Sequence, residues 1–270
     1  MQIKTPAEIL KASMVGASSK IETTVNHPWR LFIAAIAAGI FIAIGGILSL
    51  TIGFGFPELT AHNPALSKLL AGASFPIGLI LVVVLGAELF TGNNAMLIPA
   101  YMERNYGFGS VLTNWSIVYV GNFIGAVFFT YLFVFLPGLT QSDPWHSAII
   151  KIGLTKTSMN WGIVLLKGIG ANWFVCLGVW LALAGHNLIE KAFGCWLPVM
   201  AFVVLGYEHC IANMFYLPLA MMEGAEISVG QALWRNIIPA TIGNIIGGAF
   251  FVGCLHWYLH KERNRTSEEV

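Results

Sequence analysis

Six long hydrophobic stretches run through the sequence, and they restrict its fold more than any other feature. Each stretch is about 20 residues or longer, so as an α-helix rising about 1.5 Å per residue it would cross the ~30 Å hydrocarbon core of a bilayer. Their positions are 31–54, 69–101, 111–136, 161–185, 192–222 and 237–259. We therefore predict an all-α membrane protein with six spans.

The composition leaves no room for a soluble domain of ordinary size. Hydrophobic residues make up 57% of the 270 residues and charged residues 10%, whereas about 25% of a typical soluble domain is charged. Because the chain outside the spans is short, we predict a single membrane domain at 29–260. The other predicted segments are a cytoplasmic N-terminal segment at 1–28 and a cytoplasmic tail at 261–270.

A helix is predicted to begin close to the N-terminus. Thr5 and Glu8 have the spacing of a capping box, with proline at the first helical position. The apolar residues that follow share one helix face: Ile9, Leu10, Met14 and Ala17. We interpret the segment as an amphipathic helix on the cytoplasmic surface. The alternative is a frayed tail that happens to contain a cap.

The basic residues outside the spans indicate how the chain is oriented in the membrane. After six crossings, nine of them share the side of the two termini: Lys4, Lys11, Lys20, Arg30, Arg104, Lys191, Lys261, Arg263 and Arg265. Four fall on the opposite side: Lys68, Lys151, Lys156 and Arg235. Because cytoplasmic loops carry the excess of lysine and arginine, both termini are predicted to be cytoplasmic.

The second half of the sequence repeats the first. Residues 114–129 align without a gap to 236–251, and both contain G-N-x-I-G-x-x-F-F. Gly86, Glu88 and Asn93 recur with the same spacing one half later, as Gly206, Glu208 and Asn213. Close helix packing would favour the shared glycines but not the shared asparagines and glutamates. Three spans per half is an odd number, so we predict an inverted 3+3 repeat, with halves at about 29–136 and 157–260.

The second and fifth stretches carry the pattern of interrupted helices. Each places glycine, glutamate and asparagine near its middle, with a proline beyond. Unwound backbone at membrane depth must be buried in protein or line a wet cavity. We therefore interpret Glu88 and Glu208 as structural residues that accept hydrogen bonds from freed N–H groups.

Two half-helices are predicted to start at these breaks, near Asn93 and Asn213, because asparagine is a good N-cap. Their N-termini would point at the middle of the bilayer from opposite sides, each with about half a positive charge. The sequence therefore favours an anion at the centre. Half-helices also line neutral-solute channels, but neither break contains the Asn-Pro-Ala tripeptide typical of those.

His209 is the ionisable residue that helix packing explains least. It follows Glu208 inside the second break, where a binding site between repeats is expected. An unperturbed imidazole gains or loses a proton near neutral pH. The alternative is a neutral ring that ties two helices together. The four cysteines have no metal-ligand spacing, and we predict neither a metal nor a cofactor.

Several of these segments resemble the signatures of the formate/nitrite transporter family. They are GAELFTGN at 86–93, NWxxVYxGNxxGA at 114–126, ANWFVCLGVWLA at 171–182, GYEHCIANM at 206–214 and IPATIGNIIGG at 238–248. The resemblance covers essentially the whole chain. It implies an aquaporin-like fold, a homopentamer with one pore per protomer, and a place in the cytoplasmic membrane of a bacterium or archaeon. It also implies passage of small monovalent anions of weak acids, such as formate, nitrite or hydrosulfide.

The resemblance assigns roles to individual residues of this chain. His209 would be the central pore histidine, and Thr91 the residue that faces it. Lys156 would attract anions at the outer side, and Asn172 would be a pore amide. Two apolar constrictions are implied: a cytoplasmic one of Leu89, Phe90 and Val175, and a periplasmic one of Phe75, Leu79 and Phe202.

These residues suggest a transport mechanism in which the anion crosses as its neutral acid. A bare anion pays a large desolvation cost in an apolar ring, and its protonated acid pays much less. We expect His209 and Thr91 to donate or relay the proton, so that net transport is proton-coupled. The alternative is a neutral-solute channel. An enzyme is not expected, since no span carries an Asp for a protease, and no nucleic-acid partner is expected.

Overall fold

The structure is a computed structural model that describes residues 3–261, and all of its regular structure is helical. Six runs of helix are long and apolar enough to cross a membrane, which confirms the predicted number of spans. They are Pro28–Phe54, Pro64–Leu85, Phe108–Phe135, Trp161–Ala184, Leu188–Leu205 and Val229–His260. Apart from Lys261, the predicted cytoplasmic tail lies outside the described residues.

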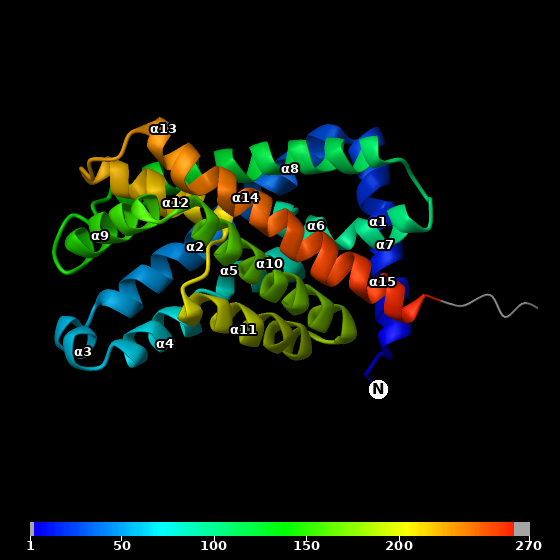
Figure 1. The fold of residues 1–270 in the computed structure, drawn as a ribbon, viewed down its shortest axis with the longest axis horizontal. Helices are drawn as coiled ribbons and strands as arrows, with labels where there is room; N and C mark the ends of the chain where they lie inside the picture. The colour runs from blue at the N-terminus through cyan, green and yellow to red at the C-terminus, as the bar shows by residue number, and fades with distance from the viewer. Residues whose placement is uncertain (1–2, 262–270) are drawn as a thin grey trace, which may run out of the picture.

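Several of these runs contain more than one helical element, and the last part of the third and two segments of the sixth are π-helix (η) (Figure 1). In chain order the elements are α1 Pro6–Asn26, α2 Pro28–Phe54, α3 Pro57–His62, α4 Pro64–Ser74, α5 Ile77–Leu85, α6 Phe90–Met96, α7 Ile98–Met102, α8 Phe108–Phe129, η1 Thr130–Phe135, α9 Trp145–Ser158, α10 Trp161–Ala184, α11 Leu188–Leu205, α12 Cys210–Met222, α13 Val229–Ala232, η2 Leu233–Ile237, α14 Ile238–Ile245, η3 Ile246–Cys254 and α15 Leu255–His260.

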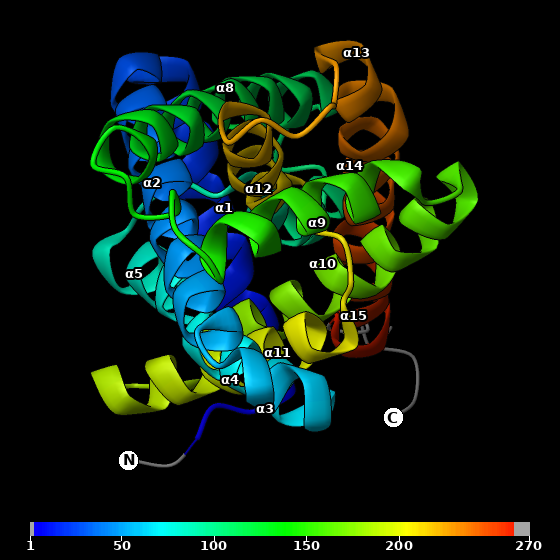
Figure 2. The ribbon, with the colours of Figure 1, turned by 90° about the vertical axis from the view of Figure 1, so that its left-hand side faces the viewer.

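The bundle has two ends, each covered by one helix that runs across it. We call them the α1 end and the α9 end, after these helices. Figure 1 shows α1, α7 and α15 at one end and α3, α9 and α13 at the other, and Figure 2 looks on to the α9 end. Lys4 Nζ donates to Leu183 O at 2.7 Å, which brings the end of α10 to the α1 end. Which end faces the cytoplasm stays a prediction.

Helix α1 begins where the capping box predicted. The Thr5 N–H donates to Glu8 Oε2 at 2.7 Å, and the Glu8 N–H donates to Thr5 Oγ1 at 3.3 Å. On the predicted apolar face, Leu10 and Ala17 are fully buried against the rest of the protein. The helix continues to Asn26, so it is longer than the predicted face and rests on the bundle.

The glycines shared by the two halves lie where helices cross closely. A Cβ added at Gly125 of α8 would lie 2.0 Å from the Ile36 carbonyl oxygen of α2. At the equivalent place in the second half, a Cβ at Gly247 would lie 2.2 Å from the Ile169 carbonyl oxygen of α10. No larger residue fits at either crossing without moving the helices apart.

The second and fifth stretches are each divided by a short loop. Helix α5 ends before Gly86, which has φ 71°, and α11 ends before Gly206, which has φ 69°. Glycine adopts this left-handed conformation without the penalty of a Cβ. The next helices, α6 and α12, start at Phe90 and Cys210. The predicted starts near Asn93 and Asn213 are therefore wrong by one turn, and these asparagines lie inside α6 and α12.

Candidate functional site

An asparagine of α8 holds the first loop, residues 86–89, in place. Asn122 Oδ1 accepts the freed N–H of Phe90 at 2.9 Å. Its Nδ2 donates to the carbonyl oxygens of Ala35 at 2.7 Å and Glu88 at 2.8 Å. One buried side chain thus satisfies backbone groups of the loop and ties it to α2. The Glu88 N–H completes the set by donating to Ala34 O at 3.1 Å.

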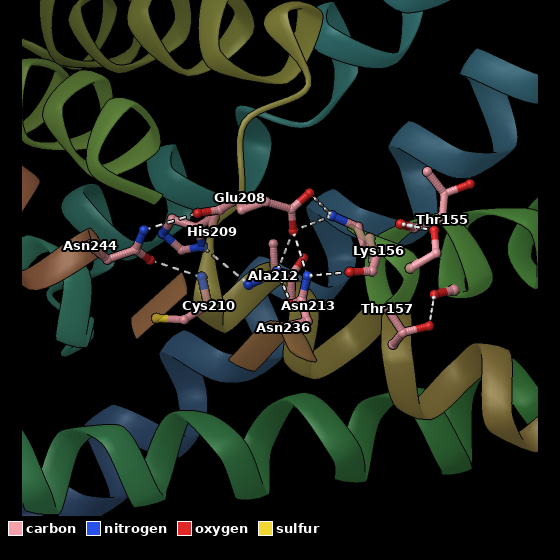
Figure 3. A network of polar contacts seen from close by, with 12 residues as sticks. Thr155, Lys156, Thr157, Glu208, His209, Cys210, Ala212, Asn213, Asn236 and Asn244 are labelled. Atoms are coloured by element: carbon pink, nitrogen blue, oxygen red, sulfur yellow. Dashed lines mark hydrogen bonds and ion pairs between the residues drawn. The ribbon is translucent and has the colours of Figure 1, made fainter. Parts of the chain in front are cut away.

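An asparagine of α14 does the same for the second loop, residues 206–209 (Figure 3). Asn244 Oδ1 accepts the N–H of Cys210 at 2.8 Å, and its Nδ2 donates to the carbonyl oxygens of Gly168 at 2.8 Å and Glu208 at 2.9 Å. Neither Asn244 nor Asn122 was among the site residues predicted from the sequence. Each is the asparagine of the repeated G-N-x-I-G motif, so the repeat contained the signal.

The glutamates bind lysine and asparagine side chains, which corrects the expectation that they accept freed N–H groups. Glu88 Oε1 lies 2.7 Å from Lys20 Nζ of α1, and its Oε2 accepts from Asn93 Nδ2 at 2.8 Å. Asn93 also donates to Asn114 Oδ1 at 2.9 Å, and Asn114 donates to Thr24 of α1. The buried amide chain connects the first loop to the helix that crosses the α1 end.

Glu208 repeats this arrangement with α9 in place of α1 (Figure 3). Lys156 Nζ lies 3.1 and 3.0 Å from the two carboxylate oxygens. Asn213 and Asn236 donate to Oε2 at 2.7 and 3.0 Å, and Asn236 also donates to Lys156 O. The Glu208 side chain is 4% exposed, so its charge is buried and its partners compensate it.

His209 and Thr91, the predicted pore-centre residues, contact one another. His209 Nε2 and Thr91 Oγ1 are 2.9 Å apart, and both residues are buried. His209 Nδ1 accepts the Ala212 N–H at 3.1 Å, so a neutral ring carries its proton on Nε2 and donates it to Thr91. The ring stacks on Phe202, with centroids 5.9 Å apart. Contacts to both nitrogens and one face therefore fix the imidazole.

Asn172 of α10 contacts the backbone of Thr91. Its Nδ2 donates to Thr91 O at 3.1 Å, Asn94 Oδ1 at 3.2 Å and Asn244 O at 2.7 Å. The Cys176 thiol also donates to Thr91 O, at 3.3 Å. Three oxygen atoms already engage the amide nitrogen of this fully buried residue, so in this structure Asn172 positions the start of α6. Sequence reasoning missed Asn94 and Cys176.

A cavity of about 480 Å³ opens at the α9 end and reaches His209. We call it the lysine cavity, because four lysines line it: Lys68, Lys151, Lys156 and Lys167. Its lining also includes Glu208 and two of the predicted periplasmic constriction residues, Phe75 and Phe202. These two rings meet edge to face at 5.8 Å, and both are 3% exposed.

The other predicted constriction residues are buried and lie outside the lining of the lysine cavity: Leu79, Leu89, Phe90 and Val175. The Phe90 ring packs edge to face against Tyr119 at 4.9 Å and Trp115 at 6.2 Å, both from α8. The structure thus brings Phe75 and Phe202 together beside His209. The pore roles of all six constriction residues stay predictions.

A family model described as "Formate/nitrite transporter" matches residues 7–258. The chain belongs to the formate/nitrite transporter family. It is a family of multi-pass membrane transporters and channels, and the three bacterial and archaeal relatives described next align over nearly their full lengths.

Three relatives in this transporter family show how similar the chain is to other members. The uncharacterized transporter YrhG of Bacillus subtilis (strain 168) is 38% identical over 270 residues, covering 100% of this chain and 98% of the relative. The probable formate transporter of Methanothermobacter thermautotrophicus is 35% identical, covering 95% and 97%. The formate channel FocA of Escherichia coli (strain K12) is 34% identical, covering 95% and 96%.

Solved structures of the formate/nitrite transporter family agree with the fold. An "FNT family ion channel" superposes with a TM-score of 0.85 at 27% identity, covering 93% of this chain and 98% of that one. A "pentameric formate channel with formate bound" superposes with a TM-score of 0.75 at 29% identity, covering 87% and 98%.

Proposed function

We propose that this protein is a channel or transporter for small monovalent anions of weak acids, most of all formate, which cross as the neutral acid past His209. The contact between His209 Nε2 and Thr91 Oγ1, at the inner limit of a lysine-lined cavity, carries the proposal. The names of two relatives support it, since FocA is a formate channel and one structural neighbour is a pentameric formate channel with formate bound.

The change of protonation state is needed because apolar rings flank the histidine. Moving a bare carboxylate into an apolar environment costs tens of kcal/mol by idealised estimates, and a neutral hydroxyl costs roughly 2–7 kcal/mol. Phe75 and Phe202, edge to face at 5.8 Å, therefore oppose the anion far more than its acid. Positive charge in the lysine cavity raises the local anion concentration before this step.

The proton at the centre has a defined carrier in this arrangement. Because Nδ1 is occupied as an acceptor, the neutral ring presents its Nε2–H to the Thr91 hydroxyl. As the hydroxyl passes a proton on to a small oxyanion, a proton from water in the lysine cavity replaces the one taken from the relay, so that the ring stays neutral. The neutral acid then crosses the apolar constriction and releases its proton in the water beyond it. Transport is proton-coupled in this scheme. Glu88 and Glu208 have a structural role.

The architecture proposed for this function follows from the repeated contacts. We propose that the second and fifth spans are interrupted membrane helices, related by an inverted 3+3 repeat. The N-termini of α6 and α12 then direct their partial positive charges to mid-bilayer. The protein assembles as a homopentamer with one pore per protomer, and both termini face the cytoplasm. These proposals rest on the equivalent loops at 86–89 and 206–209 and on the family's pentameric member.

Uptake into liposomes tests the proposal. We expect wild-type protein to take up formate faster at pH 5.5 than at pH 7.5 and to carry protons with it. His209→Phe, of similar size, should lose most of this pH dependence, because no ring nitrogen remains to supply the proton. An unaltered pH profile in this variant removes His209 from the mechanism.

A substrate panel separates the remaining possibilities. Formate, nitrite and hydrosulfide identify the preferred anion, and lactate tests the size limit. Urea and glycerol test the alternative function. Flux of these solutes without acid-coupled uptake would show a neutral-solute channel and refute the proposal. Charge movement equal to the anion flux at every pH would indicate a simple anion channel.

A further inference from the structure

Lys156 and Glu208 form a neutral pair at the lysine cavity. The Lys156 ammonium contacts both carboxylate oxygens of Glu208 at 3.1 and 3.0 Å, with side chains 15% and 4% exposed. At such short separation the two opposite charges largely cancel at the distance of an ion in the cavity. The positive charge that an entering anion experiences must therefore come mainly from other side chains.

Lys167 is the residue that best supplies this positive charge. It is the one charged residue in the sequence of α10, six residues after the helix begins, and its side chain lines the lysine cavity. A lysine placed inside an apolar span ordinarily faces a water-filled cavity or a charged partner. Within the described part of the chain, Lys167 has no carboxylate within 4.0 Å of its ammonium group.

Backbone contacts place Lys167 at the depth of the second loop. Its carbonyl oxygen accepts the Glu208 N–H at 3.3 Å, one residue from His209. The Tyr207 ring lies over Gly170, where an added Cβ would be 2.5 Å from the ring. Since Gly170 is three residues after Lys167, the two share a face of α10. The cavity wall here combines one uncompensated cation with the tyrosine beside the loop.

The two other lysines of the cavity lie nearer to solvent. Lys68 and Lys151 are both exposed, so water and salt screen their charges more strongly than that of the partly buried Lys167. We propose that Lys167 binds the small monovalent anion inside the lysine cavity, at the depth of the second loop, whereas Lys156 serves mainly to neutralise Glu208. This inference deepens the proposed function and rests on it for the identity of the anion.

The electrostatic part is tested without transport. Val203→Cys adds a thiol to the cavity wall, and its modification by an anionic and a cationic methanethiosulfonate reagent of similar size reports the local potential. Adding Lys167→Met should lower the anionic-to-cationic rate ratio about threefold to tenfold. The double change Lys156→Met/Glu208→Gln should alter the ratio less than about twofold, since it removes both charges. Protein without the added cysteine measures background labelling.

Uptake of formate into liposomes gives the second readout. We expect Lys167→Met to raise the KM for formate about threefold to tenfold with little change in kcat, and to reduce its dependence on ionic strength. Lys167→Arg should restore both. Arg235→Met is the control, because Arg235 is exposed and lies outside the cavity lining. Size-exclusion chromatography verifies that each variant is folded.

The outcomes distinguish the two proposals. If Lys167→Met leaves the labelling ratio unchanged, or if the double change lowers it more than Lys167→Met does, the assignment to Lys167 is wrong. If the ratio changes as expected but wild-type protein takes up none of the anions, the proposed function is wrong. Lys167 is then still identified as the source of positive charge in the cavity.

Discussion

At the scale of single residues, two buried asparagines hold the two loops of the site. Asn122 and Asn244 each accept one backbone N–H and donate to two carbonyl oxygens, so each satisfies three backbone groups next to a loop. The N–H at the helix start and the glutamate carbonyl of each loop would otherwise be orphaned where lipid and apolar side chains supply no partner. The loops keep one conformation because a single side chain bridges all three positions.

Replacing Asn122 or Asn244 by leucine, which has nearly the same volume, should destabilise the protein by about 2–4 kcal/mol. The change leaves the N–H of Phe90 or Cys210 buried without an acceptor. Thermal unfolding of detergent-purified protein measures the loss. Asn63→Leu is the matched control, since Asn63 is exposed and its side chain caps no helix. Unchanged melting of both core variants would contradict the role given to these amides.

At the scale of helices, the loops at 86–89 and 206–209 depend on the left-handed glycine at the start of each. A Cβ added at Gly86 or Gly206 meets nothing within 4 Å, so the difficulty for another residue there is conformational. At Gly125 the difficulty is contact, because the added Cβ would lie 2.0 Å from the Ile36 carbonyl oxygen. Glycine thus has two different functions in this chain.

Substitution by alanine separates these functions. Gly86→Ala and Gly206→Ala should each lower the free energy of unfolding by about 1–2 kcal/mol, because each places a Cβ in the left-handed region. Gly107→Ala should cost much less, because Gly107 has φ −80° and open space around it. Thermal unfolding ranks the three variants. A loss at Gly107 as large as at Gly86 would show that backbone conformation does not limit the loops.

Much of this helical layout was predictable, and the reasons are local. Six stretches of sufficient length predict six spans, and glycine followed by glutamate and asparagine predicts the interruptions at 86 and 206. The starts of α6 and α12 were misplaced by one turn because asparagine is a good N-cap, yet here it accepts no cap hydrogen bond and instead donates to a carboxylate. The lysine partner of Glu88 was missed because Lys20 is 68 residues away, and no local pattern encodes that contact.

At the scale of the whole molecule, the helices α1 and α9 act as equivalent elements. Each crosses one end of the bundle and supplies a lysine to the glutamate of the nearer loop, Lys20 to Glu88 and Lys156 to Glu208. The equivalent contacts therefore include one helix at each end of the bundle. The sequence alignment of the halves did not reach these helices.

Breaking the contact between Lys20 and Glu88 should loosen α1 from the bundle. We expect Lys20→Met to destabilise the protein by about 1–2 kcal/mol, a figure reduced for the 20% and 14% exposure of the two side chains. Lys20→Met/Glu88→Gln should recover part of the loss, because it leaves no unpaired charge. Limited proteolysis of α1 and thermal unfolding measure both. Equal losses in the single and double variants would argue against a charge-based contact.

The position of Lys20 has a practical consequence for anyone who shortens the protein. A truncated version that starts at α2 loses the ammonium group that neutralises Glu88 and the Thr24 hydroxyl that accepts from Asn114. Glu88 would then enter the bilayer without its cationic partner, with only the Asn93 amide donating to it. Poor expression of such a truncation would report on folding, and it would be an unsafe basis for assigning α1 a role in opening or closing the pore.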